Sequence, residues 1–131
     1  MEIETLVKAF DEKTLPKTAW THEAHLTVAL WYVSNYSIEE AICRVKSGIM
    51  SYNLSLANEN TGVSGYHETL TIFWMDVAHE FRLKNANFDV LALINEFLNS
   101  ENASKTFPFQ FYSKEKILSP LARSRYILPD K

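Results

Sequence analysis

Hydrophobic residues recur at intervals of three and four along most of the chain, which is the spacing of one face of an α-helix. The first run contains Ile3, Leu6, Val7 and Phe10, and it ends before Leu15-Pro16 because proline interrupts a helix. Longer segments with helical spacing, or with apolar residues on nearly every side, cover 22–34, 38–52, 65–83 and 88–98. The pattern therefore predicts four main helices preceded by a short one.

Residues that suit helix N-termini precede the main segments. Thr21 can cap the helix of 22–34, and Ser37-Ile-Glu-Glu40 matches the capping box, in which Glu40 reaches back to the cap. Ser64 or Gly65 can cap the third helix and Asn87 the fourth. The helix of 22–34 is apolar almost all round, so we expect it at the centre of the bundle.

The remaining segments predict a loop and a C-terminal wrap. Residues 54–64 (LSLANENTGVS) lack a period and are rich in loop-forming residues. In residues 107–111 (FPFQF) the aromatic rings alternate, and we expect an extended form that Pro108 enforces, followed by short helical turns near 114–118 and 121–125. The predicted fold is all-α: one domain, residues 1–131, built as an antiparallel bundle of four main helices with an extra N-terminal helix and an aromatic C-terminal wrap.

Composition and charge narrow the range of partners. A formal net charge of -3 and a pI near 5.8 provide no basic excess for nucleic-acid binding, and the longest apolar run, 28–33, is far below the ~20 residues that cross a membrane. The single Cys43 excludes an internal disulfide, and the acidic N-terminal segment does not resemble a secretory signal, so we expect a cytoplasmic protein. Cys43 itself is expected to be a buried, inert thiol. The sequence leaves open whether the chain forms a homo-oligomer.

Two similar phrases, WTHEAHLTVALWY at 20–32 and GYHETLTIFWMD at 65–76, contain three of the four histidines. If the three helices from 22 to 83 run up, down and up, the first and third are parallel and their N-terminal turns lie at the same end of the bundle. His22 and His25 are one turn apart on a mostly apolar face, and His67 starts a similar face. We therefore expect the three rings to point inward and build one site.

Side chains one turn below the histidines should shape this site. Ala29 and Thr71 are small and leave room for a cavity, while Tyr32 and Trp74 can close its floor. His79 lies twelve residues after His67, about 18 Å along the helix, and cannot join the cluster.

A metal site is one interpretation of this cluster. Imidazoles at helix N-termini are favoured in the neutral form, which is the form that a metal ion or a general base requires. His22, His25, His67 and Glu68, or Glu23 if it turned inward, would suit Zn²⁺ or a similar divalent ion with one position left for water. The spacing is neither His-Glu-x-x-His nor Glu-x-x-His. A buried polar cluster without metal and unrelated surface histidines remain as alternatives.

The leading functional hypothesis is a small-molecule site at one end of the bundle. Tyr66, Trp74 and Arg123 are its expected ligand-binding residues, and the 54–64 loop or the C-terminal arginines would cover it. If a divalent metal is present, metal-assisted hydrolysis is the first reaction class to test. One alternative is a non-catalytic binding or interaction protein with a structural histidine network and a partner surface at 107–112. Another is a pH sensor. No membrane or nucleic-acid partner is expected.

The phrases WTHEAHLTVALWY and GYHETLTIFW, with the terminal LSPLARSRYILPD, resemble those of a family of small bacterial proteins. The resemblance covers nearly the whole chain, and the motifs Trp-Thr-His-x-x-His-Leu and Gly-Tyr-His-Glu-Thr-Leu-Thr are present without departure. It implies an origin in a bacterial cytoplasm and brings no activity, cofactor or substrate with it.

Overall fold

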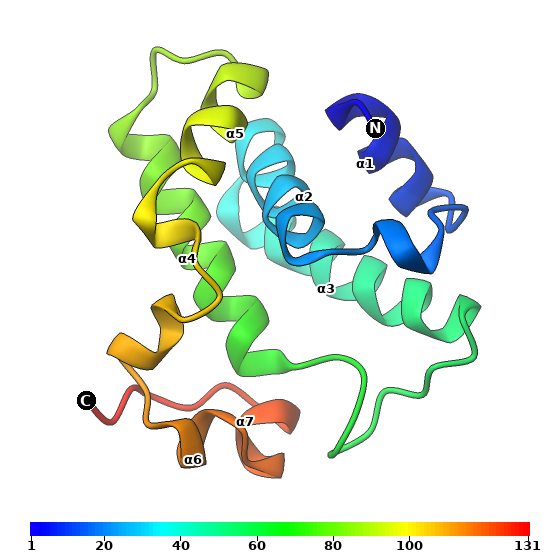
Figure 1. Cartoon of the computed structure of the whole chain (residues 1–131), viewed down its shortest axis with the longest axis vertical. Helices are drawn as coiled ribbons and strands as arrows, with labels where there is room; N and C mark the ends of the chain where they lie inside the picture. The colour runs from blue at the N-terminus through cyan, green and yellow to red at the C-terminus, as the bar shows by residue number, and fades with distance from the viewer.

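In the computed structural model, which describes residues 1–131, every regular element is helical (Figure 1). The α-helices are α1 (Ile3–Asp11), α2 (His22–Asn35), α3 (Ile38–Ser55), α4 (Glu68–Lys84), α5 (Val90–Leu98), α6 (Lys114–Ile117) and α7 (Pro120–Ser124). Three 3-10 turns, η1 (Lys17–Ala19), η2 (Glu101–Ala103) and η3 (Phe107–Gln110), lie between them. The predicted all-α bundle with its extra N-terminal helix is confirmed.

Side-chain caps fix where two of the main helices begin. The Thr21 hydroxyl accepts a hydrogen bond from the Ala24 amide at 3.2 Å, and the Ser37 hydroxyl accepts one from the Glu40 amide at 3.3 Å, as predicted. The Glu40 carboxylate does not reach back to its cap, because it accepts a hydrogen bond from Arg44 one turn further on. The capping-box prediction is therefore correct only for the serine.

The other two predicted caps were wrong. α5 begins at Val90 and its cap is Asp89, whose carboxylate accepts from the Ala92 amide at 2.8 Å; a negative charge suits this position better than the amide of Asn87. α4 begins at Glu68, and its cap is His67 in place of Ser64 or Gly65.

α2 lies at the centre of the bundle, as its apolar sequence predicts. It packs against α1, α3, α4 and α5, and eight of its 14 residues are buried. In Figure 1, α2 and α4 both run towards the top of the view, so the two helices that carry the histidine motifs are roughly parallel. The residues that fill the core around them include Phe10, Leu30, Tyr52, Met75, Leu93 and Phe97.

The segment 107–111 is helical and the predicted extended form was wrong. Residues Phe107–Gln110 form η3, because the fixed φ of Pro108 also suits the first turn of a helix. The turn brings the rings of Phe107 and Phe111 to 5.3 Å, and Phe73 of α4 lies 5.8 and 5.6 Å from them. Aromatic residues that alternate in the sequence therefore form one cluster against α4.

The C-terminal segment wraps around the first half of α4 (Figure 1). The buried Thr69 hydroxyl donates to the Ala122 carbonyl at 2.7 Å and accepts from the Ile127 amide at 3.2 Å. The Tyr112 hydroxyl donates to the Ile127 carbonyl at 2.7 Å. These bonds hold α7 and the chain end in place, so that α4 is covered on this side.

Cys43 is exposed, which contradicts the expected buried thiol. It lies on the outer side of α3, whose buried positions are Ala41, Val45, Ile49, Tyr52 and Asn53. None of the helices combines the length and the apolar character that crossing a membrane requires.

Candidate functional site

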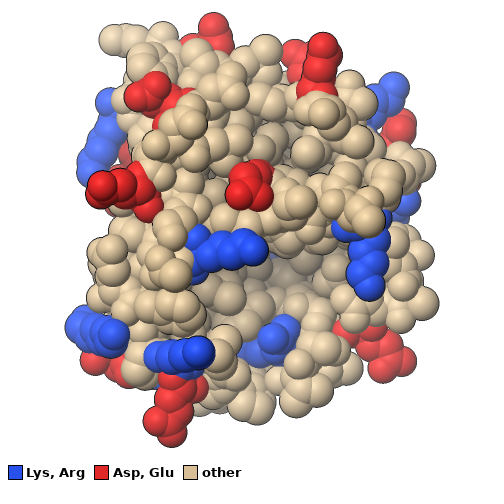
Figure 2. All heavy atoms as spheres, in the orientation of Figure 1, with Lys and Arg blue, Asp and Glu red and all other residues tan.

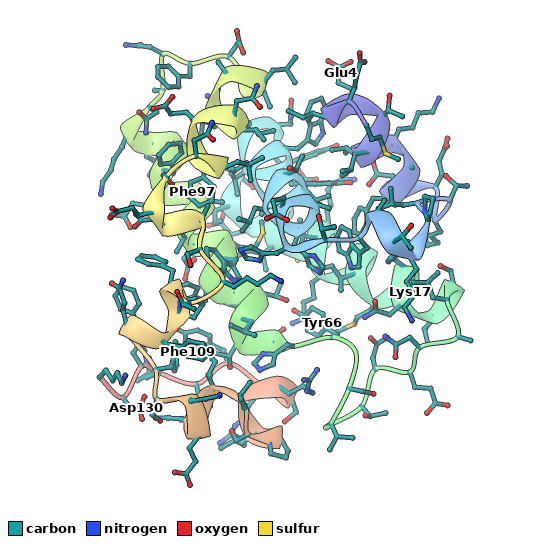
Figure 3. All side chains as sticks on the ribbon, viewed as in Figure 1. Glu4, Lys17, Tyr66, Phe97, Phe109 and Asp130 are labelled. Atoms are coloured by element: carbon teal, nitrogen blue, oxygen red, sulfur yellow. The ribbon has the colours of Figure 1, made fainter.

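A pocket of about 500 Å³ lies between α2, α3 and α4, beside the first turn of α2 and the first half of α4. Figure 2 shows it as the hollow in the middle of the visible face, and Tyr66, labelled in Figure 3, lies beside it. We call it the histidine pocket, because His22, His25 and His67 all line it. Its other lining residues are Trp20, Ala29, Val45, Ile49, Asn53, Asn58, Gly65, Tyr66, Leu70, Thr71, Trp74, Met75, Lys105 and Pro108.

His25 presents a free ring nitrogen to solvent at the pocket. Its Nδ1 lies 2.7 Å from the Thr21 carbonyl, which can only accept, so Nδ1 carries the proton and Nε2 keeps its lone pair. The ring lies against Trp20, with centroids 3.8 Å apart. His25 is exposed at the edge of the pocket, and desolvation by the protein around its ring lowers its pKa to about 4. His25 is therefore neutral at pH 7, with Nε2 able to accept a hydrogen bond.

His22 ties the start of α2 to the turn η2. Its Nε2 donates to the Ala103 carbonyl at 2.7 Å, and its ring meets Trp74 edge to face at 5.3 Å. Nδ1 makes no hydrogen bond within the protein, so His22 also keeps one ring nitrogen free.

His67 uses both of its ring nitrogens. Nδ1 accepts from the Leu70 amide at 3.1 Å and so caps α4, while Nε2 donates to the Ile117 carbonyl at 2.8 Å. Burial is the main reason that its pKa is lowered, and the nearby charge of Arg123 contributes. His67 thus joins α4 to α6 through a neutral ring at the pocket wall.

Glu68 lies beside the pocket and both of its carboxylate oxygens have partners. Oε1 accepts from the Tyr66 hydroxyl at 2.6 Å, and Oε2 accepts from Lys46 of α3 at 2.8 Å. Burial and the bond to Glu68 raise the pKa of Tyr66. The side chain of Glu68 therefore connects α3 to the first turn of α4.

The structure contains no group of three or more His, Cys, Asp or Glu side chains placed to hold one metal ion. Glu23 is exposed on the first turn of α2. To complete the predicted four-residue site with His22 and His25, His67 and Glu68 would have to release the hydrogen bonds described above. The metal site stays a prediction.

The predicted ligand-binding residues occupy different positions. Tyr66 and Trp74 line the pocket. Arg123 is absent from its walls and donates from Nη1 to the Gly65 carbonyl at 2.8 Å, so it supports the loop beside the pocket. Tyr32, expected in the floor, instead donates from its hydroxyl to Asp11 of α1. The small residues Ala29 and Thr71 do face the cavity.

The loop before α4 forms one wall and is held by a single amide side chain. Asn60 Oδ1 accepts from the Asn53 side chain and from the Tyr66 amide, each at 3.0 Å, and Asn60 Nδ2 donates to the Met50 carbonyl at 3.1 Å. Gly65 follows with φ +79°, a conformation that glycine adopts without strain. The loop that the sequence predicted at 54–64 thus begins after Ser55 and continues to the cap of α4.

Sequence reasoning missed the residues that α3 and the η2–η3 connection contribute to the pocket. Val45 and Ile49 lie on the predicted buried face of α3, so their helical spacing was a usable signal. Lys105 lies just before η3 and Pro108 lies within it, and nothing in the local sequence pattern places either residue near the histidines.

Comparison of the chain with protein-family models, curated proteins and solved structures found no match. The function is therefore inferred from the chemistry of the pocket.

Proposed function

We propose that this protein binds a small organic molecule in the histidine pocket, with His25 accepting a hydrogen bond from it. The observation that carries the proposal is a cavity of about 500 Å³ in which a neutral imidazole presents a free nitrogen among apolar walls. Pockets of roughly 300–1,000 Å³ with apolar walls and a few directed polar groups are typical of small-molecule sites. A hydroxyl or N–H group of the ligand would bind at Nε2 of His25.

The same geometry favours binding over proton abstraction. A general base works best when its pKa lies near the working pH, whereas burial holds the pKa of His25 at about 4. The ring therefore accepts hydrogen bonds well but takes a proton only weakly. Hydrolysis remains the second candidate, favoured by the two free ring nitrogens, Nδ1 of His22 and Nε2 of His25, one turn apart on α2.

A fragment screen by NMR tests the binding proposal. Small aromatic fragments bearing a hydroxyl or amide group are added to ¹⁵N-labelled protein while the indole N–H signals of Trp20 and Trp74 are followed. We expect some fragments to shift both signals, and His25→Ala to weaken those fragments about fivefold through the lost hydrogen bond. His79→Ala, which alters a histidine outside the pocket, is the matched control. A complete screen without such shifts would refute the proposal.

Zinc titration of untagged, chelator-free protein separates the two versions of this function. Stoichiometric binding that is lost in both His22→Ala and His25→Ala would support metal-assisted hydrolysis. If zinc does not bind while fragments do, the metal-free version stands.

A further inference from the structure

The histidine pocket contains no carboxylate. Its 17 lining residues include no Asp or Glu, and the one formally charged side chain among them is Lys105. In Figure 2 several blue side chains lie around the central hollow, one acidic side chain lies just above it, and the other acidic side chains lie nearer the edges of the view. A pocket lined in this way offers no carboxylate to a cationic ligand. Its one charged group, the Lys105 ammonium, is available to an anionic ligand.

Lys105 has no ion-pair partner. The three salt bridges of the molecule use Arg44, Lys46 and Lys84, and no hydrogen bond occupies the Lys105 ammonium. The pKa of Glu23 is lowered mainly by a backbone hydrogen bond, and the charge of Lys105 contributes, but the two side chains form no salt bridge. Lys105 is an exposed residue that lines the pocket, so its ammonium group is free to pair with an anionic group of a ligand.

Two further features add positive potential on this side of the molecule. Arg123 is bound to the Gly65 carbonyl, behind the loop wall, and its charge reaches His67. The N-terminal end of the 14-residue α2 meets the pocket at His22 and His25. Both features make the electrostatic potential at the pocket more positive, although neither provides a second cationic side chain on its wall.

We propose that the pocket selects an organic carboxylate, whose apolar ring contacts Trp20 and Trp74 and whose anionic group binds Lys105. This inference rests on the proposed small-molecule function. A carboxylate is favoured over a phosphate because the pocket wall has one ammonium group, without the arginine forks or rows of free backbone amides that hold a doubly charged group.

Three probes with the same ring test the ligand charge: indole-3-acetate, indole-3-acetamide and tryptamine. Their affinities are measured by following the Trp20 and Trp74 indole signals in NMR titrations. We expect the acetate to bind about five- to tenfold more tightly than the neutral amide, and tryptamine to bind most weakly. In about 0.5 M salt the advantage of the acetate should shrink, because exposed charges are screened.

Variants assign the preference to the lysine. Lys105→Gln should lower the acetate-to-amide affinity ratio to about one while the amide binds as before. Lys114→Gln, which removes an exposed lysine on α6 that does not line the pocket, is the matched control and should retain the ratio. Loss of the ratio in the Lys114 variant would overturn the assignment to Lys105.

The outcomes separate this inference from the function on which it rests. Equal binding of acetate and amide, or tightest binding of tryptamine, would overturn the carboxylate preference and leave a small-molecule pocket. No binding of any probe at millimolar concentration, together with a failed fragment screen, would refute both.

Discussion

α4 separates two pockets whose linings differ in chemistry. On one side is the histidine pocket; on the other is a smaller cavity of about 280 Å³ between α4, α5 and the C-terminal segment, which we call the aromatic pocket. The aromatic pocket is lined by Phe73, Asp76, Val77, Glu80, Phe81, Lys84, Phe97, Asn102, Phe107, Phe111, Tyr112, Tyr126 and Pro129. Neighbouring residues of one helix thus serve two cavities, with Trp74 facing the first and Phe73 the second.

The charged groups of the two pockets have opposite signs. Lys105 is the unpaired charge of the histidine pocket, whereas Asp76 is the unpaired charge of the aromatic pocket, where Glu80 and Lys84 neutralise each other at 3.0 Å. Burial raises the pKa of Asp76, as expected for a carboxylate partly removed from water. Both cavities have aromatic walls, so if both bind ligands, the sign of one unpaired charge would decide which class of ligand each prefers.

The largest expected effect concerns the loop before α4, which forms one wall of the histidine pocket. The aromatic pocket has no such wall. Gly65→Ala should destabilise the protein by about 2 kcal/mol, because the residue has φ +79° and an added Cβ would lie 2.5 Å from the Glu59 carbonyl. Gly62→Ala is the control, since its Cβ would meet nothing nearer than 4.0 Å. Urea unfolding measures both. Equal stability of the two variants would show that the wall tolerates a different backbone conformation.

Filling each pocket separately tests whether the two are independent. Leu70→Trp places a larger side chain at the wall of the histidine pocket and should weaken indole-3-acetate by at least about tenfold. Val77→Trp does the same in the aromatic pocket and should leave this probe unaffected. Both positions are half-buried and line a cavity, so the added ring can occupy the pocket without displacing fully buried side chains. If Val77→Trp weakened the probe equally, the probe would not be bound where we propose.

The aromatic pocket should prefer a cation. Tetramethylammonium can lie against its ring faces near Asp76, and we expect Asp76→Asn to weaken it about threefold in NMR titrations that follow the signals of Phe107 and Phe111. Glu96→Gln removes an exposed carboxylate of α5 outside the pocket and is the control. Equal affinity of the probe for wild type and for Asp76→Asn would contradict the proposed role of the Asp76 charge in this pocket.

The last prediction concerns the pH dependence of stability. The pKa of His25 falls from 6.5 to about 4 on folding, so the unfolded chain takes up the proton first and stability decreases as the pH falls from about 6.5 towards 4. Asp76 acts in the opposite direction, because its raised pKa makes the folded state bind its proton first. His25→Gln should therefore lose less stability than wild type between about pH 7 and about pH 5 in urea unfolding.

A residual slope in His25→Gln is expected, because burial also lowers the pKa of His67. An unchanged slope in His25→Gln would mean that the folded environment does not disfavour the charged ring.

The sequence predicted the helices, and it placed the three histidines on helices whose starts line one pocket, because both depend on short-range spacing. Apolar residues at helical intervals predicted α1 to α5, and two helices joined through a third place their N-terminal turns together. What the sequence did not predict depends on contacts distant along the chain. Ala103 is 81 residues from His22, and Ile117 is 50 residues from His67. Contacts between residues so far apart leave no periodic pattern in the sequence, so the hydrogen bonds of these two rings could not be predicted from it.

Predictions made from the local sequence also failed where two indications from the same residue disagreed. Pro108 permits both an extended segment and a helical first turn, and packing of Phe107 and Phe111 on Phe73 decided for the turn. Cys43 was assigned to the core by residue type, whereas the face of α3 on which it lies determines its exposure.

His67 illustrates how a sequence motif can contain a histidine for a structural reason, apart from any catalytic or metal-binding role. Asparagine or aspartate would cap α4 equally well, because capping needs only one acceptor near the Leu70 amide. Histidine adds a second nitrogen on the far side of a rigid ring, and that nitrogen reaches the carbonyl of Ile117. The residue acts as a non-covalent crosslink between the middle of the chain and its end. In related sequences, we therefore expect a different residue at position 67 to be found together with differences around residue 117, and less often with a difference in ligand.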